Sequence, residues 1–275
     1  MNPIEHLTVT AARIREHIVE ICAGPEGGHL GGSLSMVEVL TALYFAVMDV
    51  DPARPDHPDR DIFLLSKGHG AVGLYAALAE RGYFDPAELA TFGTHGSRLM
   101  GHPVTSVPGV EAATGSLGHG LALGAGRALA ARLDGRARRV FVLLGDGELQ
   151  EGSVWEAAMG AAALRLDNLV AVVDRNRLQL GGPTEAICPL EPLADRWTAF
   201  GWSVREAPGH DIAALVEALS GVPWEPGRPG VLVAHTTKGE GIPFVAGQAR
   251  SHFVTLSDRL RARALSALAR AAATR

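Results

Sequence analysis

Two polar residues stand where two apolar segments of this sequence end. Asp146 follows the apolar run 140–144 within Gly-Asp-Gly, and Asn176 follows the apolar run 169–173. Because ligands bind at the carboxyl ends of parallel strands, oxygen atoms from both side chains are expected in one site. Carboxylate, amide and backbone carbonyl oxygens, together with a diphosphate, suit a hard cation such as Mg²⁺ or Ca²⁺, and the glycines let a phosphate approach the backbone. Each feature alone is typical of a turn or a loop cap, but the pair at successive strand ends favours a metal–diphosphate site.

Histidines form the second group of residues suited to chemistry. Six of the eleven histidines lie next to a glycine, namely His29, His69, His95, His102, His119 and His210. A lone histidine is usually a satisfied surface or core residue, but histidines in glycine loops rather than on helix faces favour a role in a site. This applies to His29, His69 and His102, because imidazole can move protons to and from hydroxyl groups near neutral pH. The other three keep the ordinary interpretation.

Alternating apolar segments supply the elements that would position these residues. Apolar runs predict strands at 62–65, 140–144, 169–173, 202–205 and 231–234. Helical spacing predicts helices at 4–23, 71–81, 121–133, 154–164, 212–219 and 257–273, and Ser33 or Ser35 is expected to cap a helix that follows it. Strands that alternate with helices at this spacing predict an α/β fold, a parallel sheet flanked by helices. The glycine-rich segment 93–120 has little regular pattern, and a long loop in a compact domain is more often functional than empty.

Composition limits the class of protein. The chain has 275 residues, with 47% hydrophobic residues, a formal net charge of −5 and two cysteines. These values indicate one large domain or at most two small ones, exclude a disulfide framework and a four-cysteine zinc site, and give no support for nucleic-acid or membrane-surface binding. Glycine is abundant, with 33 residues, and is expected where the backbone must approach another group closely. The longest apolar stretch, 39–48, is too short to span a membrane, so we expect a cytoplasmic protein.

The motifs around these residues resemble the transketolase family of thiamine diphosphate-dependent enzymes. Gly145-Asp146-Gly147, followed after 28 residues by Asn176, is similar to the motif that binds thiamine diphosphate. The longer stretches that resemble transketolases are, in chain order, GHLGGSLS, LSKGHG, MGHP, ATGSLGHGLALGAG, GDGELQEGSVWEAA and LVAVVDRNRLQLGGPTE. The resemblance runs from residue 9 to residue 241, and it implies a single thiamine diphosphate-binding domain over residues 1–275, with a C-terminal helix at 257–273.

The resemblance assigns the strand-end residues to the cofactor and its metal ion. It implies that Asp146, Asn176 and the backbone carbonyl of Leu178 hold Mg²⁺ or Ca²⁺. It also implies that Gly147 donates its backbone N–H to the diphosphate and that Asp174 orients a neighbouring residue.

Further cofactor-binding residues are implied in the same way. His69 is expected at the diphosphate, Leu117 and Leu180 at the cofactor rings, and Gly115 in the same loop as Leu117. Glu151 resembles an acid that pairs with its twin across the dimer interface of the family, but it is equally typical of a solvated acid in the first turn of a helix.

Three histidines are implied to be catalytic. His29 and His102 are expected to contact the donor sugar near the bond that breaks. The family carries another histidine after a Lys-Gly-x-Gly turn, which is found here at 238–241, and we assign His252 to that role. His235 is the rival residue, but it precedes the turn.

One part of a transketolase has no counterpart in the resemblance. In this family, a glutamate that activates the aminopyrimidine ring of the cofactor comes from a pyrimidine-binding domain, and nothing after Asn176 resembles that domain. The resemblance therefore implies a transferase subunit that is inactive alone, the N-terminal subunit of a split transketolase. It would transfer a two-carbon ketol unit from a ketose phosphate to an acceptor such as an aldose phosphate.

The missing part implies a partner and leaves the acceptor open. A C-terminal subunit with pyrimidine-binding and C-terminal domains would complete the site, and two copies of each subunit would form an α2β2 heterotetramer. The alternative is a thiamine-dependent component that passes the two-carbon unit to a lipoyl or carrier-protein thiol in a biosynthetic pathway. The sequence does not separate the two, because the acceptor contacts lie largely on the partner.

Overall fold

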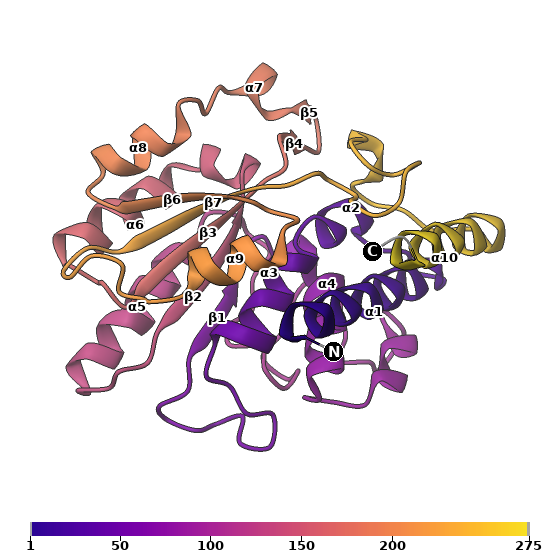
Figure 1. The fold of residues 1–275 in the computed structure, drawn as a ribbon, viewed down its shortest axis with the longest axis horizontal. Coiled ribbons are helices and arrows are strands. Elements are labelled where there is room, and N and C mark those ends of the chain that lie inside the picture. The colour runs from indigo at the N-terminus through magenta and orange to yellow at the C-terminus, as the bar shows by residue number, and fades with distance from the viewer. Residues whose placement is uncertain (1, 274–275) are drawn as a thin grey trace.

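A five-stranded parallel sheet forms the centre of the molecule. The computed structural model describes residues 2–273, and Figure 1 shows the sheet between two groups of helices. The strands, in their order across the sheet, are β1 (Ile62–Leu65), β2 (Val140–Gly145), β3 (Leu169–Arg175), β7 (Gly230–His235) and β6 (Ser203–Pro208). Gly145 of β2 pairs with Asp174 of β3, so the two candidate motifs leave the sheet side by side at its carboxyl edge. The predicted α/β class with a parallel sheet flanked by helices is confirmed.

Helices cover both faces of the sheet, which is why the strands are apolar on both sides. One face is covered by α1 (Pro3–Ala23), α3 (Val37–Ala42), α4 (Ala71–Arg81) and α9 (Ile212–Leu219), with α10 (Asp258–Ala273) packed on α1. The other face is covered by α5 (Gly120–Leu133), α6 (Gly152–Ala163) and α8 (Leu193–Ala199). Successive residues of β2 enter opposite cores, Phe141 on the α1 side and Val142 on the α5 side. A continuous apolar run is therefore what such a central strand requires.

Short elements connect the main helices and strands. Before β3 these are α2 (Leu30–Leu34), the π-helical turn η1 (Leu43–Val47), and the 3-10 turns η2 (Gly68–Gly70), η3 (Pro86–Thr91) and η4 (Gly147–Gln150). After β3 they are the hairpin β4 (Leu178–Gln179) and β5 (Gly182–Pro183), α7 (Thr184–Ile187) and the 3-10 turn η5 (Ala249–Ser251). Residues 92–119, all of them described, form no helix or strand, as the glycine-rich pattern predicts.

The prediction that Ser33 or Ser35 caps a helix is wrong. Ser33 lies inside α2 and Ser35 directly follows it, while α3 begins after Met36 without a side-chain cap. The Ser35 hydroxyl donates to the carboxylate of Asp174 on β3, a tertiary contact that takes the place of a local cap. The first turn of the chain does carry a cap, because Asn2 and Glu5 form a capping box at the start of α1. Within residues 2–273, no helix has the length and apolar character needed to cross a membrane.

Candidate functional site

The carboxylate of Asp146 is buried at the end of β2. Its side chain is 1% exposed and accepts hydrogen bonds from the Arg175 guanidinium at 3.0 Å and from the Gly147 backbone N–H at 2.8 Å. The backbone N–H of Arg177 also donates to it. Burial, and then the negative charge of Asp174, raise the pKa of Asp146 to about 6. A carboxylate in this environment gains from a further positive charge nearby.

Asp174, at the end of β3, is fully buried and supplied with donors. The Lys67 ammonium and the hydroxyls of Ser35 and Thr236 all donate to its carboxylate. Burial acts to raise the pKa of Asp174, but the Lys67 charge and these hydrogen bonds bring it below its usual value. The amide Nδ2 of Asn176 also donates to Asp174 at 3.2 Å. Asp174 therefore fixes which way the Asn176 amide points, consistent with the orienting role expected of it.

The strand ends offer hard oxygen donors for a cation. The donors are the Asp146 carboxylate, Asn176 Oδ1 and the Leu178 carbonyl; Asn176 Oδ1 now accepts from the Leu178 N–H at 3.0 Å. A Cβ placed on Gly147 would lie 2.9 Å from the Cβ of Gln179, which leaves no room for a larger residue. In the described part of the chain, no group of three or more His, Cys, Asp or Glu side chains could hold a metal. A cation here would need amide, carbonyl and ligand oxygens, which fits Mg²⁺ or Ca²⁺ with a diphosphate.

Four histidines converge beside these strand ends. The ring centroid of His29 lies 5.5 Å from that of His69, 6.0 Å from His102 and 5.2 Å from His252. The rings of His69 and His252 are also 5.2 Å apart. These rings come from four separate segments of the chain, so the fold has built a cluster that no local motif contains.

Burial keeps His29, His69 and His252 of this cluster neutral. Burial lowers the pKa of His29 to about 4, helped by His102 and Lys238. Burial and the Lys67 charge lower the pKa of His69 to about 2, and burial and the Lys238 charge lower the pKa of His252 to about 4. Neutral imidazoles can both accept and donate a proton, which suits them to hydroxyl groups of a substrate.

Two buried lysines belong to the site and were missed from the sequence. Lys67 is paired with Asp174, and Lys238 Nζ donates to His252 Nδ1 at 3.1 Å and to the Leu178 carbonyl at 3.4 Å. Burial, and then the Lys67 charge, lower the pKa of Lys238 to about 8. Both lie in motifs that carry the resemblance, LSKGHG and the turn at 238–241, and both follow strands of the sheet. Their positions at strand ends were the signal that could have found them.

A third buried group, Glu148, shapes the loop beside the site. Its carboxylate accepts from the Gly118 N–H at 2.9 Å and the Gly145 N–H at 3.0 Å, and also from the Ser66 hydroxyl. Burial raises the pKa of Glu148. The end of β2 and the segment before α5 are thereby joined through one side chain.

The remaining predicted cofactor residues lie around this edge with differing exposure. Gly115 has a φ of 155°, and a Cβ there would lie 3.0 Å from the His102 ring. Leu117 is partly buried three residues before α5, whereas Leu180 is 73% exposed in the turn of the β4–β5 hairpin. Glu151 is exposed at the N-cap of α6 and makes no capping hydrogen bond. Their roles remain predictions.

The other histidines lie outside the cluster. His235 on β7 is 40% exposed and pairs with Glu206 on β6 at 2.7 Å, so the structure brings His252 rather than His235 to the histidine cluster. His119 contacts the Leu117 carbonyl at 3.0 Å. His210 bonds Glu38 at 3.0 Å and accepts from the Thr237 N–H at 2.7 Å.

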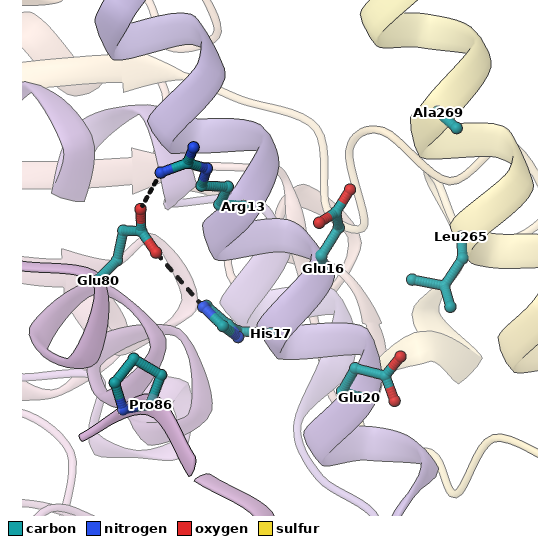
Figure 2. Close-up of a pocket in the computed structure, with 8 residues that line it drawn as sticks. All are labelled: Arg13, Glu16, His17, Glu20, Glu80, Pro86, Leu265 and Ala269. Carbon is teal, nitrogen blue, oxygen red and sulfur yellow. Dashed lines mark hydrogen bonds and ion pairs between the residues drawn. The ribbon is translucent and has the colours of Figure 1, made fainter.

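A groove of about 700 Å³ lies away from this edge, along α1, α4 and α10. Figure 2 shows that Arg13 and His17 both reach toward Glu80, at 3.2 and 3.4 Å, while Glu16 and Glu20 face the C-terminal helix. Glu20 is itself paired with Arg261. Paired surface charges of this kind do not make a reactive centre, so the strand ends remain the candidate site.

Comparison with known proteins gives consistent matches over most of the chain. Residues 6–265 match the family described as "Transketolase, thiamine diphosphate binding domain". The chain is 45% identical over 249 residues to one subunit of the apulose-4-phosphate transketolase of Phocaeicola vulgatus, covering 90% of this chain and 89% of that protein. It is 44% identical over 234 residues to the 6-deoxy-6-sulfo-D-fructose transketolase subunit SqwG of a Clostridium species, covering 85% of each.

Solved structures of transketolases share the fold of this chain but belong to longer chains. A transketolase variant from Pichia stipitis superimposes with a TM-score of 0.90 at 29% identity, over 98% of this chain but 41% of that one. Transketolase from Leishmania mexicana gives a TM-score of 0.85 at 30% identity, over 100% of this chain and 46% of that one. The chain therefore spans less than half the length of these solved proteins.

Proposed function

The chain belongs to the family of transketolase thiamine diphosphate-binding domains, and we propose that it is the N-terminal subunit of a split transketolase, a transferase that works with a second subunit. The reaction would move a two-carbon ketol unit from a ketose phosphate to an aldose phosphate. Residues 1–275 would act as a single domain. The observation that carries this proposal is the meeting, at one edge of the sheet, of Asp146, Asn176 and four clustered histidines.

Thiamine diphosphate and a divalent cation fit the residues present. Asp146, Asn176 and the Leu178 carbonyl would hold Mg²⁺ or Ca²⁺, and the Gly147 N–H and His69 would contact the diphosphate. When bound, thiamine diphosphate supplies a carbon that can accept the two-carbon unit and stabilise it as the electron sink. Buried Lys67 and Lys238 add positive charge beside the strand ends, which favours an anionic cofactor.

The histidine cluster would do the proton transfer. His29, His102 and His252 would hydrogen-bond the hydroxyl groups of a sugar chain, and the ring centroids of His102 and His252 lie within 6.0 Å of that of His29. Because His29 and His252 are neutral near pH 7, each can take a proton from a hydroxyl on one nitrogen or donate one to a developing alkoxide. The Lys238 ammonium donates to His252 Nδ1, which leaves the Nε2 side of that ring to carry the proton.

Three observations support a partner subunit: the length of this chain, the names of its relatives, and the exposed apolar side chains near the histidine cluster. Three relatives of similar length are each named as one subunit of a transketolase. The solved transketolase chains are more than twice as long. Large apolar side chains stand exposed in segments that border the cluster: Met100 at 44%, Leu180 at 73% and Phe253 at 54%. Phe253 packs its edge on His29 at 5.1 Å between centroids. A partner that covers this rim would bury these side chains and exclude water from the cofactor rings.

A second copy of the chain is proposed on the α5–α6 side. Leu123 and Leu133 of α5, Met159 of α6 and Leu164 just after it are 45%, 77%, 56% and 45% exposed. Exposed Glu151 begins α6, where it would approach its counterpart in the second copy. Two copies of each subunit would give an α2β2 heterotetramer.

The experiment compares the purified chain with and without its co-encoded C-terminal subunit. Both samples receive Mg²⁺, thiamine diphosphate, a ketose phosphate donor and a panel of aldose phosphate acceptors. Ketol transfer only in the combined sample supports the proposal, and turnover by the isolated chain would overturn the partner requirement. Transfer to a lipoyl or carrier-protein thiol in place of every aldose would replace the proposed acceptor.

A further inference from the structure

Arg175, the last residue of β3, carries a buried positive charge that no part of the proposed function uses. Its side chain is 1% exposed. One terminal nitrogen donates to Asp146 at 3.0 Å and to the Thr184 hydroxyl at 2.9 Å. The other donates to Glu185 at 2.7 Å and to Glu191 at 2.8 Å. A single guanidinium therefore links the end of β2 to three residues of the segment that follows β3.

The two glutamates that bind Arg175 also accept hydrogen bonds from the backbone of the same segment. The Glu185 carboxylate accepts from the Leu190 N–H at 3.1 Å, and the Glu191 carboxylate accepts from the Leu193 N–H at 3.0 Å. Both glutamates are otherwise half-exposed, so Arg175 is what holds them at one point. The path from α7 to the start of α8 is thus held by these charged side chains as well as by Leu190 and Leu193, which are buried in the apolar core.

The same segment carries atoms proposed to touch the cofactor. The segment 178–191 contains the Leu178 carbonyl, Leu180 and the hairpin against which Gly147 packs. Its other ties to the sheet edge include the Gln150 amide, which donates to the Thr184 and Cys188 carbonyls at 3.3 and 2.9 Å. The position of the hairpin consequently depends on a few polar contacts, of which Arg175 makes the most central.

A bound cation with its diphosphate would provide a second link between the end of β2 and the segment 178–191. It would touch Asp146 at the end of β2 and the Leu178 carbonyl of the segment, while Arg175 joins Asp146 to Glu185 and Glu191. Order imposed by one link reduces the conformational entropy that the other must remove. The two links should therefore strengthen each other, and by linkage the effect must be reciprocal.

We propose that Arg175 is a positioning residue that holds the segment 178–191 on the carboxyl edge of the sheet, so that order in this segment and binding of thiamine diphosphate with its cation support each other. The tether itself rests only on the contacts of Arg175. The coupling rests on the proposed function, because it requires that thiamine diphosphate binds here.

The test is hydrogen exchange of the peptide that spans residues 178–193, measured in the full chain with and without Mg²⁺ and thiamine diphosphate. In Arg175→Met the amides of Leu190 and Leu193 should exchange about tenfold faster without cofactor, and the affinity for thiamine diphosphate should fall about tenfold, within the usual range of coupling between sites. Arg175→Lys should recover only part of both effects, because a lysine cannot reach three carboxylates with a planar fork.

Two further variants keep the test decisive. The double variant Glu185→Gln/Glu191→Gln leaves the Arg175–Asp146 contact in place and changes only half-exposed side chains, so it should fold even if Arg175→Met does not. It should still speed hydrogen exchange in the segment 178–191 and lower the affinity for thiamine diphosphate. The matched control is Arg139→Met, which removes an arginine–carboxylate pair with Asp61 at the opposite edge of the same sheet and should change neither quantity.

Each result decides one part. Unchanged exchange of the segment in Arg175→Met or in the double variant overturns the tether. Faster exchange with unchanged cofactor affinity overturns the coupling and leaves Arg175 a structural residue. If the wild-type chain, alone and with its partner, binds no thiamine diphosphate, the proposed function fails and the coupling with it, while the cofactor-free exchange still judges the tether.

Discussion

Both edges of the central sheet carry ion pairs between a basic side chain and a carboxylate, but the pairs differ in burial. At the amino edge, Arg139 precedes β2 and pairs with Asp61, which precedes β1, and the arginine side chain is 23% exposed. At the carboxyl edge, Lys67 pairs with Asp174 and Arg175 with Asp146, and all four side chains are at most 1% exposed. The amino edge holds an ion pair whose arginine is partly solvated, whereas both ion pairs at the carboxyl edge lie wholly in the interior.

The difference teaches where function is expected on this sheet. The Asp61 carboxylate has a structural role, because it accepts hydrogen bonds from the backbone N–H groups of Asp49 and Arg139 at 2.8 Å each. These bonds hold the segments that lead into β1 and β2. At the carboxyl edge, burial raises the pKa of Asp146 to about 6 and lowers that of Lys238 to about 8, so both groups titrate closer to neutral pH than they would in water. Perturbed groups that face one another at strand ends are typical of sites, and buried ion pairs are weak evidence for stability alone.

The largest expected effect is a loss of catalytic rate when a residue at the carboxyl edge is replaced. His29→Asn should lower the rate of ketol transfer by the complete enzyme by about 10²- to 10⁴-fold, because a positioned proton-transfer group is worth that much. Steady-state kinetics with the partner subunit measure it, and the thermal midpoint of the variant should stay close to that of the wild type. A kcat within a few-fold of the wild type would remove His29 from the proposed chemistry.

The next effect is on stability at the carboxyl edge. Lys67→Met should lower the free energy of unfolding by about 3–5 kcal/mol, because it leaves the buried Asp174 charge without its cation. Urea denaturation followed by circular dichroism gives the value. The double variant Lys67→Met/Asp174→Asn should regain part of the loss, and a single-variant loss below about 1 kcal/mol would place this pair with ordinary surface pairs.

A smaller effect is expected at the amino edge. Arg139→Met should cost about 1–2 kcal/mol, because the pair is partly solvated but its hydrogen bonds join two chain segments. Its affinity for thiamine diphosphate, measured by calorimetry in the presence of Mg²⁺, should equal that of the wild type. Weaker cofactor binding in this variant would show that the two edges are not functionally separate.

The smallest effect is a pH dependence of stability. The pKa of His29 is about 4 in the folded chain and ordinary in the unfolded chain, so between those values the unfolded state binds more protons. The stabilising neutral state is fully present above the ordinary value, and stability falls as the pH drops toward 4. His29→Asn should therefore lose less stability on acidification than the wild type, by about 2–4 °C in thermal midpoint.

A comparison of variant and wild type is needed because another group acts in the opposite direction. Asp146, with its pKa raised to about 6, binds a proton more readily in the folded chain and gains stability as the pH falls in the same window. This contribution is common to both proteins and cancels in the difference. Equal pH profiles for His29→Asn and the wild type would contradict the buried, neutral state of His29.

The sequence predicted the framework of the fold because central strands and helices leave periodic patterns. The runs before Asp146 and Asn176 became β2 and β3, and the register Gly145 to Asp174 explains why motifs 30 residues apart meet. The serine cap failed because a buried tertiary partner, Asp174, competes for Ser35, and local pattern carries no information about such a partner.

The burial of the charged residues at the site could not be predicted from the sequence, for a similar reason. Lysine and arginine are almost never fully buried unless they are paired, so Lys67, Arg175 and Lys238 read as surface residues until their partners are known. The approach of His252 to His29 likewise depends on how η5 packs against α2. Residue types and strand ends locate a site, whereas its electrostatics come only from three-dimensional packing.

The central claim is that the carboxyl edge binds thiamine diphosphate through Asp146, and calorimetric titration of the cofactor tests it most directly. The complex of the chain with its partner subunit is titrated with and without Mg²⁺, alongside Asp146→Asn in the same complex. We expect saturable binding that requires the cation and is weakened at least about a hundredfold in the variant, more than the loss typical of groups that only support a ligand. Binding that ignores both the cation and the substitution would contradict the account.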